Sequence, residues 1–202
     1  MSDETQVLLT RAAWLRILAD PAEFSRLILG RPLRPYQIEP LRAIARSVWQ
    51  RAGLTFTVMF ARQMGKNELS AHLEAYLLFV HRRHGGDIIK AAPTFQPQAL
   101  ISKRRLEGLL NNPTTGRLWR SEGSHSVRLM RARAFFFSGE PTANVVGATA
   151  SLLLEIDEAQ DFDREKYQRD FRPMAATSNA TTVLYGTAWS EDDLLAQQKR
   201  IN

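Results

Sequence analysis

The feature that most constrains this chain is an alternation of strand-like and helix-like segments along the middle of the sequence. Residues 55–61 (TFTVMFA) are β-branched and aromatic, and they have the length of a strand. A Gly-Lys turn and a helix over about residues 68–84 follow. A second strand over 87–93 and a helix over 96–111 repeat the order. This spacing predicts βαβ units and a parallel sheet.

Two more strands and a hairpin are expected later in the sequence. Residues 151–156 (SLLLEI) are almost continuously apolar, which is typical of a strand buried on both faces. Residues 181–185 form another strand-like run, and residues 190–202 predict a charged helix. Residues 126–138 contain two strand-like runs with little between them, so we expect an antiparallel hairpin at a sheet edge.

Helical segments precede the sheet. Residues 7–29 are helical apart from a break at Asp20-Pro21, because proline cannot continue a helix and disfavours helix in the residue before it. A further helix is expected over residues 34–51. The predicted organisation is a helical N-terminal extension, residues 1–32, followed by one α/β domain, residues 33–202.

Composition narrows the class of protein. The 202 residues include no cysteine, which excludes disulfides and thiolate metal sites. No stretch approaches the roughly 18 apolar residues of a membrane span, and the acidic, polar N-terminus is unlike a secretory signal. An intracellular soluble protein is therefore expected. The net charge of +6 suits nucleic acid or nucleotide phosphates, although a modest basic excess also serves solubility.

The most informative turn is Phe60-Ala61-Arg62-Gln63-Met64-Gly65-Lys66-Asn67, between a strand and a helix. Backbone N–H groups at such a turn point toward a bound anion, and the helix dipole favours negative charge. Gly65 allows a close approach of the backbone, and Lys66 can reach phosphate oxygens. Phe60 and Asn67 depart from the G-x-x-x-x-G-K-[ST] pattern, so a plain strand-to-helix turn is the alternative.

The second chemical signal is the acidic end of the strand over 151–156. Asp157 and Glu158 follow it directly, and ligands of α/β proteins bind at this edge of the sheet. Asp157 can hold Mg²⁺, and Glu158 can orient and deprotonate a water molecule. A polar strand end that caps the next helix is the alternative. Together, the two signals predict an ATPase site. Glu155 is unexpected inside such a strand, and an edge-facing or site-facing position would suit it.

Four segments, which follow one another along the chain in the order found in that family, resemble the ATPase domain of the large terminase subunit of tailed bacteriophages. Residues 61–67 resemble the deviant Walker A of that family, in which Arg-Gln precedes Gly-Lys, and residues 152–158 resemble its Walker B with a catalytic glutamate. Residues 33–37 (LRPYQ) are similar to its adenine-recognition segment, and residues 185–188 (YGTA) to its coupling motif. The resemblance implies a P-loop NTPase of the ASCE/RecA-like kind, with a mainly parallel β-sheet flanked by helices.

The resemblance also implies roles for individual residues. Glu158 would be the catalytic base, and Arg62 would stabilise charge in the transition state. Tyr36 would stack on adenine, Gln37 would bind the edge of the base, and Asp157 and Asn67 would hold the metal. The remaining implied residues are Gln63, Gly65 and Lys66 for the nucleotide, and Gly186, Thr187 and Ala188 for coupling. ATP and Mg²⁺ are the implied cofactors.

The resemblance further implies that the protein drives double-stranded DNA into a procapsid, gripping it through phosphates without base readout. The implied partners are the portal protein, the small terminase subunit and further copies in a ring of about five, in the cytoplasm of the bacterial host during virion assembly. No membrane partner is expected. These 202 residues include no segment that matches the C-terminal nuclease domain of the family, so no DNA cleavage is expected from them.

A neighbouring subunit could supply a further arginine to the site. Some terminases carry that arginine before a glycine where this chain has Val146-Gly147. Arg128, Arg131 and Arg133 of the expected hairpin are other candidates, and solvated surface arginines are the simpler interpretation.

Two other functions fit the same residues. Asp157-Glu158-Ala159-Gln160 also fits the box of a DEAD-like helicase or translocase, which would need a second RecA-like domain. A degenerate nucleotide-binding module that only scaffolds a DNA complex is the non-enzymatic alternative, and the presence of both Lys66 and Glu158 argues against it.

Overall fold

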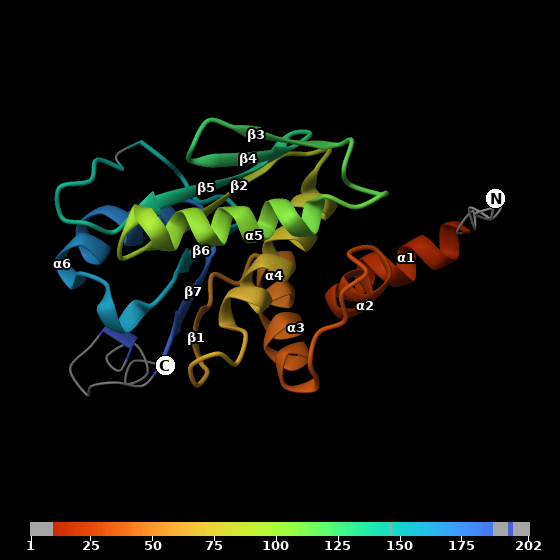
Figure 1. Ribbon diagram of the computed structural model, residues 1–202, viewed down its shortest axis with the longest axis horizontal. Coiled ribbons are helices and arrows are strands. Elements are labelled where there is room, and N and C mark those ends of the chain that lie inside the picture. Colours follow the sequence, from red (N-terminus) through yellow and green to blue (C-terminus); the bar gives the residue numbers. More distant parts are fainter. Residues whose placement is uncertain (1–9, 146, 188–193, 196–202) are drawn as a thin grey trace.

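The computed structural model describes residues 10–145, 147–187 and 194–195 of the chain, and its centre is a seven-stranded sheet with helices on both faces (Figure 1). The strand order is β1-β7-β6-β2-β5-β4-β3. Neighbours from β1 to β5 are parallel, and β5, β4 and β3 are antiparallel. The predicted α/β class with a mainly parallel sheet is confirmed. The strands are β1 (Thr55–Met59), β2 (Gly86–Ala92), β3 (Trp119–Glu122), β4 (Ser126–Leu129), β5 (Ala132–Ser138), β6 (Leu153–Ile156) and β7 (Thr181–Gly186).

Most helices lie where the sequence predicts them. The helix after the Gly-Lys turn begins at Lys66, and the segment over residues 164–176 is helical, although the sequence analysis assigned it no structure. Of the charged helix expected over 190–202, only Leu194 and Leu195 lie within the described residues, and both are buried. The helices are α1 (Arg11–Ala19), α2 (Pro21–Leu27), α3 (Pro35–Gln50), α4 (Lys66–His81), η1 (Phe95–Ala99), α5 (Leu100–Leu110), η2 (Ala159–Asp161), α6 (Arg164–Lys166), η3 (Tyr167–Phe171) and α7 (Arg172–Ala176).

The predicted hairpin is confirmed as β4 and β5, but its position differs from the expectation. β5 pairs in parallel with β2, so it lies inside the sheet, and β3 forms the edge beyond β4. The sequence of β3, WRSE, is short and exposes its two middle residues, so it carries no alternation that could predict a strand. The edge is therefore a short, polar strand, as is common for sheet edges.

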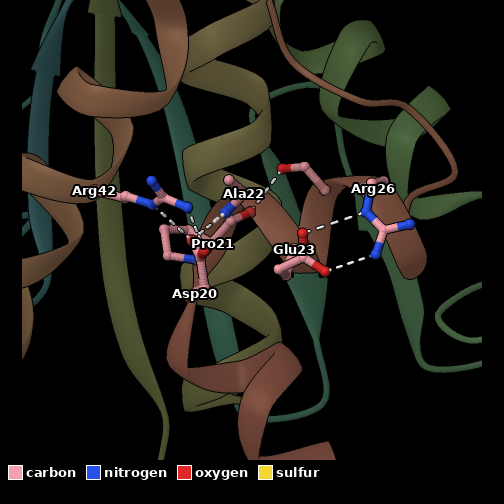
Figure 2. A network of polar contacts seen from close by, with 7 residues as sticks. Asp20, Pro21, Ala22, Glu23, Arg26 and Arg42 are labelled. Carbon is pink, nitrogen blue, oxygen red and sulfur yellow. Dashed lines mark hydrogen bonds and ion pairs between the residues drawn. The ribbon is translucent and has the colours of Figure 1, made fainter. Parts of the chain in front are cut away.

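The N-terminal helices pack against α3 and α4, as Figure 1 shows. Phe24 of α2 is fully buried against the rings of Tyr76 and Phe79. The chain breaks between α1 and α2 at Asp20, as predicted, and Figure 2 shows why the break is stable. The Asp20 carboxylate accepts a hydrogen bond from the N–H of Ala22 (3.0 Å) and pairs with Arg42 of α3 (2.5 Å). In the part of the chain that the structure describes, no helix is long and apolar enough to cross a bilayer.

Two layers of core lie on opposite faces of the sheet. The face covered by α3, α4 and α5 includes Leu153 and Val183, and the face covered by η3 and α7 includes Leu154 and Leu184. Neighbouring residues of one strand therefore belong to different layers, because side chains alternate across a strand. The parallel strands β1, β7, β6, β2 and β5 place their carboxyl ends at one edge of the sheet, where the loop before α4 also lies.

Candidate functional site

The loop between β1 and α4 has the backbone geometry of an anion-binding turn. Gly65 precedes the helix with φ 79°, and Gln63 has φ 61°. The positive φ favours glycine there, and a Cβ on Gly65 would lie 2.7 Å from Nε2 of Gln37, so that side chain would have to shift. The first N–H groups of α4 have no acceptor within the helix and open toward this loop.

Tyr36 and Gln37, at the start of α3, hold the loop from the side. Gln37 Nε2 donates to the carbonyl of Gly65 (2.9 Å), and the Tyr36 hydroxyl donates to the carbonyl of Met64 (3.0 Å). The Tyr36 ring also packs edge-on against Phe60. The structure thus places both residues at the loop, and their contact with adenine stays a prediction.

The acidic end of β6 lies beside the loop. Asp157 is almost fully buried and its Oδ2 accepts a hydrogen bond from Ser102 of α5 (3.2 Å). Glu158 adopts a left-handed conformation (φ 45°), and its Oε2 lies 3.9 Å from the Lys66 ammonium nitrogen. Gln160 donates to the same carboxylate oxygen (2.7 Å). Lys66 and Glu158, predicted from separate motifs, therefore face one another.

The end of β7 completes the arrangement. The Lys66 ammonium donates to the Thr187 hydroxyl (2.7 Å), which in turn donates to the carbonyl of Phe60 (3.2 Å). The N–H of Thr187 donates to Oε1 of Gln160 (3.1 Å). A Cβ on Gly186 would lie 2.5 Å from that same Oε1, so glycine permits this close approach. Ala188, the third predicted coupling residue, lies outside the described residues.

Two adjoining cavities open around these groups, and both are lined by Gln63, Lys66 and Glu158. The first has a volume of about 270 Å³ and is also lined by Asn67 and by Arg105 of α5. The second has a volume of about 430 Å³, and it is also lined by Arg62, Gln98, Gln160, Asp161 and Thr187. Nearly all of the predicted site residues therefore lie in or beside one open region at the strand ends.

A charged group that the sequence did not reveal borders the first cavity. Arg105 Nη1 pairs with Glu68 of α4 (2.7 Å), and His72 lies 3.3 Å from the other carboxylate oxygen of Glu68. The hydrogen bond with His72, followed by that with Arg105, lowers the pKa of Glu68 to about 2. Glu68 is therefore a fixed anion at neutral pH. Arg105 lies on α5, far from the loop in sequence, so no local pattern could have indicated it.

Glu155 is neither edge-facing nor site-facing, which corrects the sequence-based expectation. It is fully buried and points toward α4, where it accepts a hydrogen bond from Ser70 (2.9 Å). Burial and the neighbouring Glu74 raise its pKa well above the ordinary range. Burial opposes a charge on Lys90 nearby, but the carboxylates of Glu74, Glu155 and Asp157 raise its pKa nonetheless.

The arginines of the β4–β5 hairpin lie toward the β3 edge of the sheet, and two of them form ion pairs. Arg128 pairs with Glu122 (2.8 Å) and Arg133 pairs with Asp87 (2.8 Å), while Arg131 is exposed. Val146 lies outside the described residues. Within the described part of the chain, these contacts are those of surface arginines.

The donor set at the strand ends suits a nucleotide with its metal. Mg²⁺ is usually held by one or two carboxylates together with the phosphates of a substrate. Asp157 offers a carboxylate just after β6, although it is 3% exposed and lines neither cavity, and Asn67 of the first turn of α4 lines the first cavity and offers an amide oxygen. Lys66 and the N–H groups of the loop offer the positive ends that phosphates need. The residues present therefore fit both ATP and Mg²⁺.

The chain matches no family model and no curated protein, but its fold is found among solved structures. The large terminase of bacteriophage HK97 superimposes with a TM-score of 0.63 and 21% identity, over 93% of this chain and 40% of that one. The ATPase domain of the large terminase of Thermus phage P74-26 gives 0.61 and 20%, over 85% and 71%. The chain has the fold of a phage large-terminase ATPase domain. The large terminase of a further, thermophilic bacteriophage gives 0.57 at 10% identity, over 83% of this chain and 42% of that one. The chain spans about two fifths of the length of the HK97 protein.

Proposed function

We propose that this chain is the ATPase domain of a large terminase, hydrolysing ATP to drive double-stranded DNA into a procapsid. The observation that carries the proposal is the meeting of Lys66, Glu158 and Thr187 at one edge of the sheet, from three different elements. The terminase fold and the four sequence segments that resemble the family support the same conclusion.

The arrangement assigns a task to each group. Lys66 and the loop N–H groups bind the phosphates, and Tyr36 and Gln37 hold the loop and contact the base. Glu158 orients a water molecule and accepts its proton. Asp157 and Asn67 would hold Mg²⁺, which would supply positive charge to neutralise the phosphates. Arg62, which lines the second cavity, stabilises the charge that develops on the transferred phosphoryl group.

The hydrogen bond between Lys66 and Thr187 suggests how hydrolysis is communicated. The Lys66 ammonium contacts Thr187 in this structure, and it would have to turn toward phosphates to bind them. That movement would release Thr187 and alter its contacts with Phe60 and Gln160. Gly186 ends β7 and Thr187 follows it directly, so the nucleotide state is passed to this strand.

The proposed partners follow from the same assignment. Duplex DNA would be gripped through its phosphates, so its affinity should fall steeply as salt rises. The portal protein, the small terminase subunit and further copies in a ring of about five complete the motor in the host cytoplasm. No nuclease activity is proposed for these 202 residues.

The test is Mg²⁺-dependent ATP hydrolysis at high protein concentration, with Glu158→Gln as the decisive variant. We expect this substitution to lower kcat by about 10²–10⁴-fold and to leave ATP binding intact. Glu165→Gln, the same change at an exposed position on α6, is the matched control and should hydrolyse ATP normally. Hydrolysis that survives Glu158→Gln would refute the assignment.

Other outcomes of the same assay decide between the alternatives. Nucleotide binding without turnover, together with DNA affinity that ATP does not alter, would support a scaffold module. ATP-dependent strand separation would support a DEAD-like helicase instead.

A further inference from the structure

Beneath the candidate site lies a cluster of buried polar side chains, which we call the buried cluster: Ser70, Glu74, Lys90, Glu155 and Tyr185. All five are 0–1% exposed, and they come from α4, β2, β6 and β7. Lys90 donates to Ser70 (2.5 Å) and to Glu74 (3.1 Å). The hydroxyl of Ser70 lies 2.9 Å from Glu155 and 3.0 Å from Glu74. The buried cluster thus joins the helix of the phosphate loop to the strands of the sheet.

The members lie a short distance along the chain from the groups that would act on ATP. Ser70 follows Lys66 by one turn of α4. Glu155 precedes Asp157 by two residues on β6, and Tyr185 precedes Thr187 by two residues on β7. The three elements α4, β6 and β7 therefore each carry a member of the buried cluster close in sequence to the residue that they bring to the site.

Stability alone is a poor explanation for these side chains. Removing two carboxyl groups and an ammonium from water is costly, and well-packed apolar residues of similar size are often as stabilising or more so. The opposite face of the same strands carries Leu154 and Ile89 at the neighbouring positions. Two carboxylate oxygens, Oε2 of Glu74 and Oε2 of Glu155, have no hydrogen-bond partner in the described part of the chain.

Ser70 has a special position in the buried cluster. Its hydroxyl carries one proton and faces two carboxylates, so it can donate to only one of them at a time. Donation to Glu155 ties α4 to β6, whereas donation to Glu74 stays within α4. The bond between Ser70 and Glu155 is therefore the one that links the loop helix to the acidic strand through this hydroxyl.

We propose that Ser70 and Glu155 are positioning residues that set the Glu158 carboxylate relative to the Lys66 ammonium by joining α4 to β6. This inference rests on the proposed ATPase function for its catalytic consequence. It assigns no contact with substrate to either residue. A loss of their hydrogen bond should leave ATP binding in place and misalign the group that activates water.

The test compares Ser70→Ala with Ser47→Ala. Ser47 of α3 is also buried, and its hydroxyl bonds to Thr181 at the opposite end of β7 (2.7 Å). Both variants lose one buried serine hydroxyl between a helix and a strand, so they control for stability. We expect Ser70→Ala to lower kcat about 10- to 100-fold with KM for ATP within about twofold. Ser47→Ala should retain normal kcat, and Glu155→Gln, which keeps an acceptor for Ser70, should be milder than Glu155→Leu.

A second measurement tests the positioning role without requiring ATP hydrolysis. Hydrogen–deuterium exchange of nucleotide-free protein should show faster exchange of residues 153–160 in Ser70→Ala than in Ser47→Ala. Equal kcat in the two serine variants, or equal exchange over these residues, would overturn the inference. A wild-type protein without hydrolysis would refute the proposed function instead, and the exchange comparison would still decide the positioning role.

Discussion

The two faces of the central sheet are built from the same strands but differ in chemistry. The face toward α4 carries Ile88, Lys90, Leu153, Glu155, Val183 and Tyr185, whereas the opposite face carries Ile89, Ala91, Leu154, Ile156 and Leu184. Apolar burial on the second face favours folding without any directional requirement. The charged residues of the first face require specific partners, and they lie behind the strand ends that form the candidate site. The comparison indicates that one face mainly stabilises the fold and the other also orients the site.

The strongest challenge to this comparison is Lys90→Met. The substitution leaves the Glu74 carboxylate buried without its cation, beside the carboxyl group of Glu155, so we expect a loss of about 3–5 kcal/mol in the free energy of unfolding. Denaturation with urea measures it. The counterpart is the triple variant Glu74→Leu, Lys90→Met and Glu155→Leu, which makes this face apolar as well. That variant should be as stable as the wild type or more so, and a loss comparable to that of Lys90→Met would contradict the comparison.

Leu154→Ala tests the apolar face at the neighbouring position of β6. Leu154 is fully buried, so truncation should cost on the order of 3 kcal/mol through lost burial and a residual cavity. Urea denaturation gives this loss. At a temperature where the variant stays folded, kcat for ATP should match the wild type. A large fall in kcat would show that both faces orient the site, and the distinction between them would not hold.

The sequence predicted the parts of the molecule that depend on neighbouring residues. The βαβ order, the Gly65-Lys66 turn and the buried strand before Asp157 are local patterns, and the structure has all of them. The position of Arg105 beside the site and the partners of Glu155 could not be predicted, because they depend on contacts between residues far apart in the sequence. The hydrogen bond between Arg105 and Glu68 spans 37 residues, and that between Ser70 and Glu155 spans 85. The edge strand β3 could not be predicted either, because its four residues show no alternation of apolar and polar side chains. The contacts of the site residues with ATP, Mg²⁺ and DNA stay predictions.

Asp20→Ala tests a polar contact on the same side of the sheet as α4, between Asp20 and Arg42, which is exposed to solvent, unlike the buried cluster. Asp20 caps α2 and pairs with Arg42, whose guanidinium lowers its pKa (Figure 2). Loss of the cap should cost about 1 kcal/mol, measured by urea denaturation. Arg42→Ala removes the ion pair but keeps the cap, and this control should cost less because Arg42 is half-exposed. Equal losses would place the stabilisation in the ion pair instead of the cap.

The smallest effect is expected from Asp170→Asn, among the helices that cover the apolar face. Asp170 pairs with Arg169 (2.8 Å) and Lys166 (2.7 Å), and these cations lower its pKa from 3.8 to about 2. A lowered pKa stabilises the folded state above the unfolded value, and that stability is lost as pH falls from about 4 to about 2. We expect Asp170→Asn to cost roughly 0.5 kcal/mol at pH 7.

The cost of Asp170→Asn should shrink as the pH falls to 2, where about half of the wild-type carboxyl is protonated as well. Urea denaturation of both proteins at several pH values between 2 and 7 measures the difference. Parallel pH profiles would show that Asp170 contributes nothing to the acid sensitivity of this side. The ion pairs around η3 would then have no measurable effect on stability, and the stability of this side would come from the apolar layer that they border.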